Sequence, residues 1–294
     1  MAVQELRTVI DRQQWLEPMS DTLQKATSNA LTGGRARQRV DDFLNGVWLG
    51  HPVHPMVTDI PIGAWTLTLA LDGVETLTGR HDFSPGADAA VCIGIAGALA
   101  SAATGLAQWQ YTDAESRREG MAHALLNTGA LALYGASAIL RARGKRGLGR
   151  LAALAGFGAV ALSSYLGGDL AYDLRVGINH APGQQPPNDF TPVLAESALA
   201  EGAMKALDVG DVRLMLVRQH GQVFAIAREC SHLGGPLEEG QLSDGCVTCP
   251  WHASTFTLDD GRVVNGPATF AQPVYETRVR DGQIEVRAER TAQM

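Results

Sequence analysis

The chain has 294 residues, which is enough for two domains of ordinary size. Apolar residues other than glycine make up 45%, only 19% are charged, and 33 are glycine. This composition excludes a disordered chain and a collagen-like scaffold. The net charge of −7 argues against a nucleic-acid-binding protein. Four cysteines are too few for a disulfide-dense fold but enough for one metal cluster.

Residues 1–50 are predicted to form an N-terminal extension without a signal peptide, because acidic residues come early and no apolar run follows. Trp15, Phe43 and Trp48 lie among charged residues in this segment. The pattern favours interfacial helices that lie on a membrane, and an ordinary solvated helical extension is the alternative.

Three long apolar runs follow, over residues 89–107, 122–140 and 151–168, and none contains Asp, Glu, Lys or Arg. Each run is long enough to cross the hydrocarbon core of a bilayer. Residues 52–71 are a fourth candidate, although Asp59 interrupts them. We therefore predict an all-α four-helix transmembrane bundle, and a soluble bundle of buried helices is the alternative.

This transmembrane domain is predicted over residues 51–180, and the Pro-rich residues 181–188 are predicted to be a linker. The rest of the chain, 189–290, has short alternating runs separated by turn residues. It is predicted to be an all-β domain, which makes the chain a multidomain protein. The predicted strands are Leu214–Val217, Val223–Ile226, Val274–Val279 and Ile284–Val286.

The β domain contains two cysteine–histidine pairs with the spacing of a metal site. Cys230 and His232 form a C-x-H motif, Cys249 and His252 form a C-x-x-H motif, and 16 residues lie between the two motifs. Two thiolates on one iron and two imidazoles on the other make a Rieske [2Fe–2S] centre. A zinc site is the alternative for such a set. The other cysteines, at positions 92 and 246, are interpreted as small buried apolar residues.

These motifs resemble the Rieske family over about residues 189–289. The matching segments are Cys-Ser-His-Leu-Gly-Gly-Pro at 230–236, Cys-Pro-Trp-His-Ala-Ser-Thr-Phe at 249–256 and Gly-Pro-Ala at 266–268. The resemblance implies a [2Fe–2S] cluster bound by Cys230, His232, Cys249 and His252, with no catalytic residue assigned.

Three departures from the quinol-oxidising Rieske proteins suggest a subtype. Their two disulfide cysteines correspond to Gly235 and Trp251, and their tyrosine near a ligating sulfur corresponds to Phe256, whereas their hydrogen-bonding serine is kept as Ser254. Fewer hydrogen bonds to sulfur disfavour the reduced cluster. The centre therefore resembles the ferredoxins of aromatic-ring dioxygenases, with an expected potential of about −150 mV.

Polar residues at the ends of the predicted spans suggest a second site. With four spans, the start of the first and third and the end of the fourth lie on the same side of the membrane as the β domain. This places His51, His54, His123 and His180 in one layer, together with residues such as Asp169. Ionisable residues within spans are costly and commonly mark a site.

Two imidazoles from different helices of a bundle can hold a haem b, and His54 with His123 is the favoured pair. His51 and His180 are alternative ligands. A metal ion or a quinone also fits, as does purely structural polar packing. This half resembles an uncharacterised bacterial family of small four-helix membrane proteins. It does so in His-Pro-Val-His-Pro at 51–55, in His123 with Asn127, and in 167–179. That resemblance implies a membrane location.

Together these features predict a membrane-bound one-electron carrier that passes electrons between a reductase and a membrane or oxygenase partner. It would be an electron-transfer component and not a stand-alone enzyme. Residues 189–294 carry nine basic and 15 acidic side chains, which favours a basic patch on the redox partner. The alternatives are a quinol-linked Rieske subunit, a redox sensor and a terminal oxygenase. The last would need a mononuclear iron held by two histidines and a carboxylate, but no histidine follows His252.

The expected location is the bacterial inner membrane, crossed several times. Six basic residues lie near each predicted face, so their distribution does not decide the orientation. A Rieske domain without the disulfide suits a reducing compartment, which favours a cytoplasmic β domain.

Overall fold

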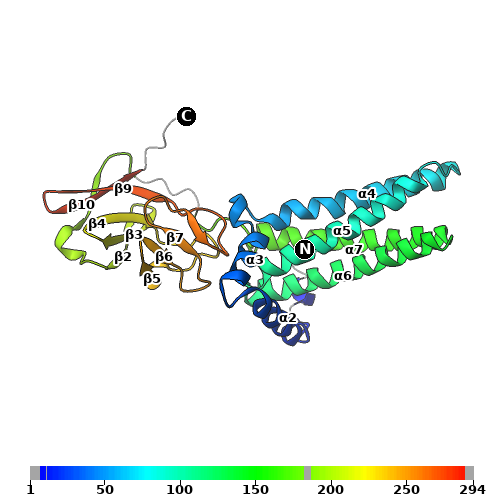
Figure 1. The fold of residues 1–294 in the computed structure, drawn as a ribbon, viewed down its shortest axis with the longest axis horizontal. Helices are drawn as coiled ribbons and strands as arrows, with labels where there is room; N and C mark the ends of the chain where they lie inside the picture. The colour runs from blue at the N-terminus through cyan, green and yellow to red at the C-terminus, as the bar shows by residue number, and fades with distance from the viewer. Residues whose placement is uncertain (1–6, 11, 182–186, 289–294) are drawn as a thin grey trace. The chain divides into compact units, whose positions relative to one another are not determined.

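The computed structural model describes residues 7–10, 12–181 and 187–288. Within it the chain forms two compact units (Figure 1). We call the described residues up to 33, together with 53–176, the helical unit. Residues 34–52 and the described residues from 177 onwards form the β unit. Most of the predicted linker, 182–186, lies outside the described residues.

The helical unit is dominated by four long helices that form two hairpins. In Figure 1, α4 runs beside α5 and α6 runs beside α7, and each pair is joined by a short loop. A shorter helix, α2, precedes them in the chain. The bounds are α2 Leu16–Leu31, α4 Val53–Thr78, α5 Ser84–Trp109, α6 Ala114–Ala142 and α7 Arg146–Tyr172.

Three of these helices are long and apolar enough to cross a membrane, namely α5, α6 and α7. Helix α4 has the length, but Asp59, Asp72 and Glu75 are spread along it and interrupt its apolar residues. Four long helices are present, as predicted, and three of them qualify as spans by length and composition. The all-α character of this half is confirmed.

The interior of the bundle depends on glycines that face aromatic rings. Trp65 of α4 and Tyr134 of α6 stack with ring centroids 4.0 Å apart and planes 2° from parallel. A Cβ atom on Gly94 would lie 2.1 Å from Nε1 of Trp65, and one on Gly156 would lie 2.9 Å from the Tyr134 ring. The rings fit only because α5 and α7 present no side chain at these two positions.

The β unit contains two antiparallel sheets. The six-stranded sheet has the order β1-β10-β9-β4-β3-β2, and the four-stranded sheet has the order β5-β6-β7-β8. The strands are β1 Thr191–Ala195, β2 Met204–Val209, β3 Val212–Gln219, β4 Gln222–Ala227, β5 Gln241–Ser243, β6 Cys246–Thr248, β7 Thr255–Thr257, β8 Val263–Asn265, β9 Val274–Arg280 and β10 Gln283–Ala288. The four predicted strands lie within β3, β4, β9 and β10, so the all-β prediction is confirmed.

Tight hairpins join neighbouring strands of the larger sheet. Gln219 pairs with Gln222 across a two-residue turn in which His220 and Gly221 both have positive φ, at 53° and 74°. This is the backbone that a right-twisted hairpin requires, and glycine adopts it readily. Glycine at position 221 therefore suits this turn.

A segment from the N-terminal part of the chain belongs to the β unit. It contains α3 Arg35–Asn45 and the 3-10 helix η1 Val47–Leu49. The Asp42 carboxylate accepts a hydrogen bond from the backbone N–H of Gly266 at 2.9 Å. The His51 ring meets the edge of Phe270 with centroids 6.0 Å apart. The predicted extension, residues 1–50, is thus divided between the two units.

Candidate functional site

The four predicted cluster ligands lie on two loops of the β unit. Cys230 and His232 follow strand β4, whereas Cys249 and His252 lie between β6 and β7. The exposed fractions of Cys230 and Cys249 are only 1% and 3%. Strands of two different sheets therefore present the two motifs in a buried position.

The first loop is closed by its own backbone. Cys230 donates its N–H to the Gly235 carbonyl at 2.8 Å, and Gly234 donates to the Cys230 carbonyl at 2.8 Å. The side chain of Gln272 fixes the same loop from outside, because its Oε1 accepts the N–H of Ser231 at 3.0 Å. The Gln272 amide also donates to the Ala227 carbonyl at 3.0 Å. These bonds hold the backbone between the two ligands of this loop.

The second loop repeats the backbone pattern of the first. Cys249 donates to the Ser254 carbonyl at 2.8 Å, and Ala253 donates to the Cys249 carbonyl at 3.1 Å. Ala253 has a φ of 60°, and the matching Gly234 of the first loop has a φ of 76°. The Ser254 hydroxyl accepts the N–H of Ala268 at 3.0 Å, which ties the loop to the chain beyond it.

The side chains of the two loops converge. The thiols of Cys230 and Cys249 are hydrogen-bonded to each other, and neither forms a disulfide. The rings of His232 and His252 meet edge to face with centroids 5.1 Å apart. The sulfur ligands therefore form one pair and the nitrogen ligands form another.

The environment of the thiols favours metal binding. The pKa of Cys249 is lowered to about 7, chiefly because the Cys230 thiol donates to its sulfur, and the N–H groups of Trp251 and His252 contribute. The pKa of Cys230 is raised because its proton is held by Cys249 and because it is buried. A thiolate is the form of cysteine that binds metal, and one of the pair is poised to supply it.

The imidazole of His232 is also in its ligand form. The pKa of His232 is lowered to about 3, mainly by burial and additionally by the neighbouring His252 and His180. The ring is neutral at physiological pH, and only a neutral imidazole offers a lone pair to a metal ion.

Two sulfur and two nitrogen donors fit a [2Fe–2S] cluster, because each iron of a Rieske centre takes two protein ligands. In the described part of the chain, no three Asp, Glu, His or Cys side chains converge as a site for one ion. Gly235 leaves room beside the sulfur, because a Cβ there would lie 2.9 Å from Sγ of Cys249 and 3.1 Å from the Trp251 ring. The residues therefore fit a binuclear group held in two pairs.

The four histidines predicted to share a membrane layer fall into two groups. His51 and His180 lie in the β unit, where His51 contacts Phe270 and the backbone N–H of His180 donates to the Ser231 carbonyl at 3.0 Å. His54 and His123 lie in the helical unit. The structure thus brings His180 to the first ligand loop.

His54 and His123 each bond a neighbouring helix through Nδ1. His54 Nδ1 lies 3.0 Å from the Ser101 carbonyl and 3.2 Å from the Thr104 hydroxyl. His123 Nδ1 lies 2.9 Å from the Ser163 carbonyl and 3.0 Å from its hydroxyl. The amide of Asn127 donates to Nε2 of His123 at 3.0 Å.

Asp169, also singled out in the sequence, takes part in an ion-pair group near the end of α7. It accepts from Nε of Arg7 at 3.0 Å, and the same guanidinium lies 3.4 Å from the buried Glu119. Arg7 also pairs with the more exposed Asp173.

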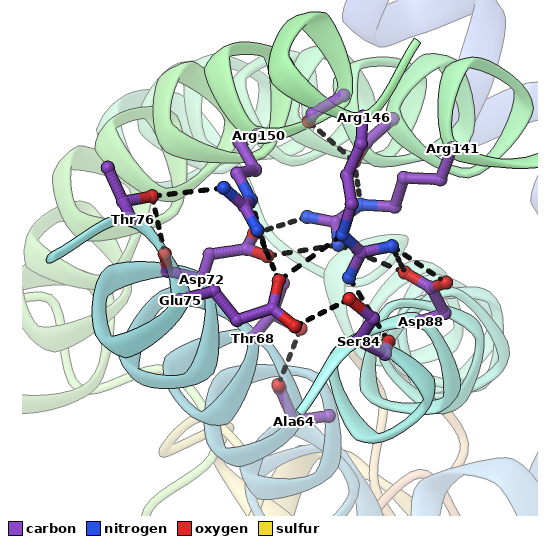
Figure 2. A network of polar contacts seen from close by, with 12 residues as sticks. Ala64, Thr68, Asp72, Glu75, Thr76, Ser84, Asp88, Arg141, Arg146 and Arg150 are labelled. Carbon is purple, nitrogen blue, oxygen red and sulfur yellow. Dashed lines mark hydrogen bonds and ion pairs between the residues drawn. The ribbon is translucent and has the colours of Figure 1, made fainter. Parts of the chain in front are cut away.

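A larger network of charges lies near the loops α4–α5 and α6–α7 (Figure 2). Arg141 is only 2% exposed and bonds Asp72 and Asp88, each through Nη1 at 3.0 Å. Glu75, fully buried, accepts from the Ser84 hydroxyl at 2.5 Å. The remaining cations are Arg146 and Arg150, which both pair with Glu75. Three arginines balance three carboxylates, so the network joins all four long helices without a net charge.

Comparisons with known proteins assign both halves. Residues 189–276 match the family described as Rieske [2Fe-2S] domain. The chain is 33% identical over 98 residues to the anthranilate 1,2-dioxygenase ferredoxin subunit of Burkholderia cepacia, covering 33% of this chain and 91% of that protein. The chain belongs to the Rieske family. Residues 50–180 match the family described as predicted membrane protein (DUF2231).

Other relatives of the Rieske half differ in size. The human apoptosis-inducing factor 3 is 31% identical over 94 residues, which are 32% of this chain but only 16% of that protein's length. A solved structure, the ferredoxin of carbazole 1,9a-dioxygenase from Nocardioides aromaticivorans IC177, is 26% identical. It aligns over 36% of this chain and 100% of its own length, with a TM-score of 0.33.

Two sets of residues near these sites were not found from the sequence. Gln272 is 2% exposed and supports the first Rieske loop, but a lone glutamine between Ala and Pro gives no local signal. Asp72 and Arg141 were also overlooked: Asp72 follows an apolar stretch and is a signal of this kind, whereas Arg141 begins a basic run and does not stand out.

Proposed function

We propose that the protein is a membrane-bound one-electron carrier whose Rieske cluster exchanges electrons between a reductase and a membrane or oxygenase partner. The observation that carries the proposal is the convergence of two buried thiols and two imidazoles on closed loops. A [2Fe–2S] group supplies reversible one-electron chemistry when bound.

Each ligand candidate has a defined task. Cys230 and Cys249 are proposed to hold one iron, and His232 and His252 the other. The backbone bonds of both loops fix these side chains before the group binds, so little reorganisation is needed. The N–H groups directed at the Cys249 sulfur stabilise negative charge there.

The details of the sulfur environment favour a low reduction potential. Phe256 is fully buried in the core of the β unit and offers no hydroxyl. The Ser254 hydroxyl remains available beside the second loop. With fewer donors to the cluster, we expect a potential near −150 mV, at the low end for Rieske centres.

The location proposed is a bacterial inner membrane, with the β unit in the cytoplasm. Three apolar helices and the match to a membrane-protein family support membrane association. The absence of a disulfide among the described cysteines supports a reducing compartment for the β unit. The similarity to the anthranilate 1,2-dioxygenase ferredoxin subunit supports a reductase or oxygenase as the soluble redox partner.

The proposal is tested on the detergent-purified full chain by electron paramagnetic resonance and potentiometric titration. We expect a Rieske signal on reduction and a midpoint near −150 mV. Cys249→Ser is expected to abolish the signal, whereas Cys246→Ser, three residues away, is expected to keep it.

Two results would contradict the proposal. One is stoichiometric zinc with no iron in freshly isolated protein. The other is a midpoint several hundred millivolts higher, because that value would favour quinol oxidation over a ferredoxin role.

A further inference from the structure

The two hairpins of the helical unit are copies of one pattern. A shift of 69 residues carries four polar or aromatic positions of α4 onto α6. The matched pairs are His54 with His123, Trp65 with Tyr134, Thr68 with Ser137, and Asp72 with Arg141. The last three pairs are buried on both helices. One face of each helix is therefore built to the same plan.

The second helix of each hairpin repeats as well. A shift of 62 residues carries the buried face of α5 onto that of α7. The matched pairs are Ala87 with Gly149, Val91 with Ala153, Gly94 with Gly156, Ser101 with Ser163, Thr104 with Leu166, and Gly105 with Gly167. The contacts repeat with the residues: Gly94 and Gly156 each receive an aromatic ring, and Gly105 and Gly167 each receive an imidazole.

This duplication divides the interior of the bundle into layers of equivalent residues. In the aromatic layer, Trp65 and Tyr134 stack on each other. In the charged layer, Asp72 and Arg141 form an ion pair. In both layers the two equivalent side chains, one from each hairpin, are in direct contact with each other.

The imidazole layer is different, because its two members do not bond each other. His54 and His123 lie within electrostatic reach. Each ring uses Nδ1 on the equivalent serine carbonyl of the neighbouring helix, Ser101 or Ser163. A carbonyl only accepts, so Nδ1 must carry the proton in both rings and Nε2 must carry a lone pair.

The lone pairs are held in a way that suits metal ligation. A metal-binding histidine commonly donates its other N–H to a backbone carbonyl, which fixes the tautomer and the ring. In the described residues His54 Nε2 has no hydrogen-bond partner, and His123 Nε2 has only the Asn127 amide. Equivalent helices thus present two preset imidazole donors to one layer.

The number of donors selects the kind of ligand. No third His, Cys, Asp or Glu joins the pair within the described chain, so a bare ion would receive only two protein ligands. A haem supplies four equatorial nitrogens of its own and needs two axial donors. Between the imidazole and aromatic layers, the buried positions of α4 and α6 are Pro61 and Ala130, which carry no large side chain.

We propose that His54 and His123, related by the internal duplication of the hairpin, are the axial ligands of a b-type haem in the helical unit. The Asn127 amide leaves Nε2 of His123 when the haem binds. The site rests on the geometry of the bundle alone, and its use as an electron partner of the cluster rests on the proposed function.

The test is the visible spectrum of the detergent-purified full chain, with haemin titrated in when the isolated protein lacks it. We expect one haem per chain, sharp Soret and α bands after dithionite reduction, and a low-spin signal. His54→Ala and His123→Ala should each lose the low-spin spectrum, and added imidazole should restore it. His81→Ala, which changes an exposed histidine in the α4–α5 loop, should bind haem normally. Asn127→Ala should bind at least as tightly.

The cluster spectrum of the same samples reports whether each variant has folded. Failure of the wild-type chain to bind haemin specifically would overturn the haem site while leaving the proposed electron carrier intact. Retention of the low-spin spectrum in either alanine variant, with the cluster present, would overturn the assignment of the pair. Haem binding in a chain without a Rieske signal would instead contradict the proposed function alone.

Discussion

The two units build their polar sites on different scales. In the β unit, all four ligand candidates lie within residues 230–252, and each loop is closed by bonds to residues four and five positions ahead. In the helical unit, the ion pair of Asp72 with Arg141 joins residues 69 positions apart. A local site survives changes elsewhere, whereas a site assembled from separate helices depends on how those helices pack.

The strongest way to break this contrast is Arg141→Met in the helical unit. The change leaves Asp72 and Asp88 close together without their central cation, so we expect a loss of about 3–5 kcal/mol of stability. Thermal unfolding in detergent measures it, with Arg143→Met at an exposed position as the control. The cluster signal of the β unit should be unaffected. Equal effects of the two substitutions would contradict the importance of the network.

The double variant Asp72→Asn with Arg141→Met sharpens the same test. Removing both side-chain charges leaves neither partner buried without the other. The loss of stability in the double variant should therefore be smaller than the sum of the losses in the two single variants. Simple additivity would indicate that the two side chains act independently.

A smaller effect is expected for Gln272→Ala in the β unit. The substitution leaves the Ser231 N–H and the Ala227 carbonyl without their partner, which costs about 1–3 kcal/mol. The rate at which the cluster bleaches on heating measures this loss of stability, and we expect the rate to be higher in the variant. Gln241→Ala, at an exposed position of β5, is the control and should leave the rate unchanged.

The smallest effects are expected for substitutions at equivalent positions of the two ligand loops. Ala253 adopts the left-handed conformation that its counterpart Gly234 adopts without strain. We expect Ala253→Gly to stabilise the loaded protein by up to about 1 kcal/mol, and Gly234→Ala to destabilise it by about 1–2 kcal/mol. Thermal unfolding of the loaded protein distinguishes the signs. The same sign for both would show that the loops are not equivalent.

Most of the β unit could be predicted from the sequence because its signals are local. Alternating apolar residues mark β3 and β4, and glycine marks the turn between them. The ligand motifs needed only the spacing of cysteine and histidine. Gln272 could not be found, because its role depends on strand β9 bringing it beside a loop some 40 residues earlier.

The helical unit was predicted as helices but not as a duplication. Small apolar residues dominate all four helices, so the repeat is carried by a few positions such as His54 and His123. The repeat becomes evident only when the buried residues and the contacts of one hairpin are compared with those of the other. Hydropathy alone passes over α4, because it does not record that the buried charges of this helix pair with arginines on α6 and α7.

The segment 34–52 gives the β unit an unusual order of synthesis. Asp42 leaves the ribosome 224 residues before Gly266, the residue whose N–H it accepts. At 5–20 residues per second, this interval lasts about 10–45 s. During that time the whole of α4–α7 is made and becomes available to the membrane. The β unit is therefore the last part of the chain to be completed. A shortened chain that begins after residue 176 would lack the segment 34–52, which belongs to the β unit.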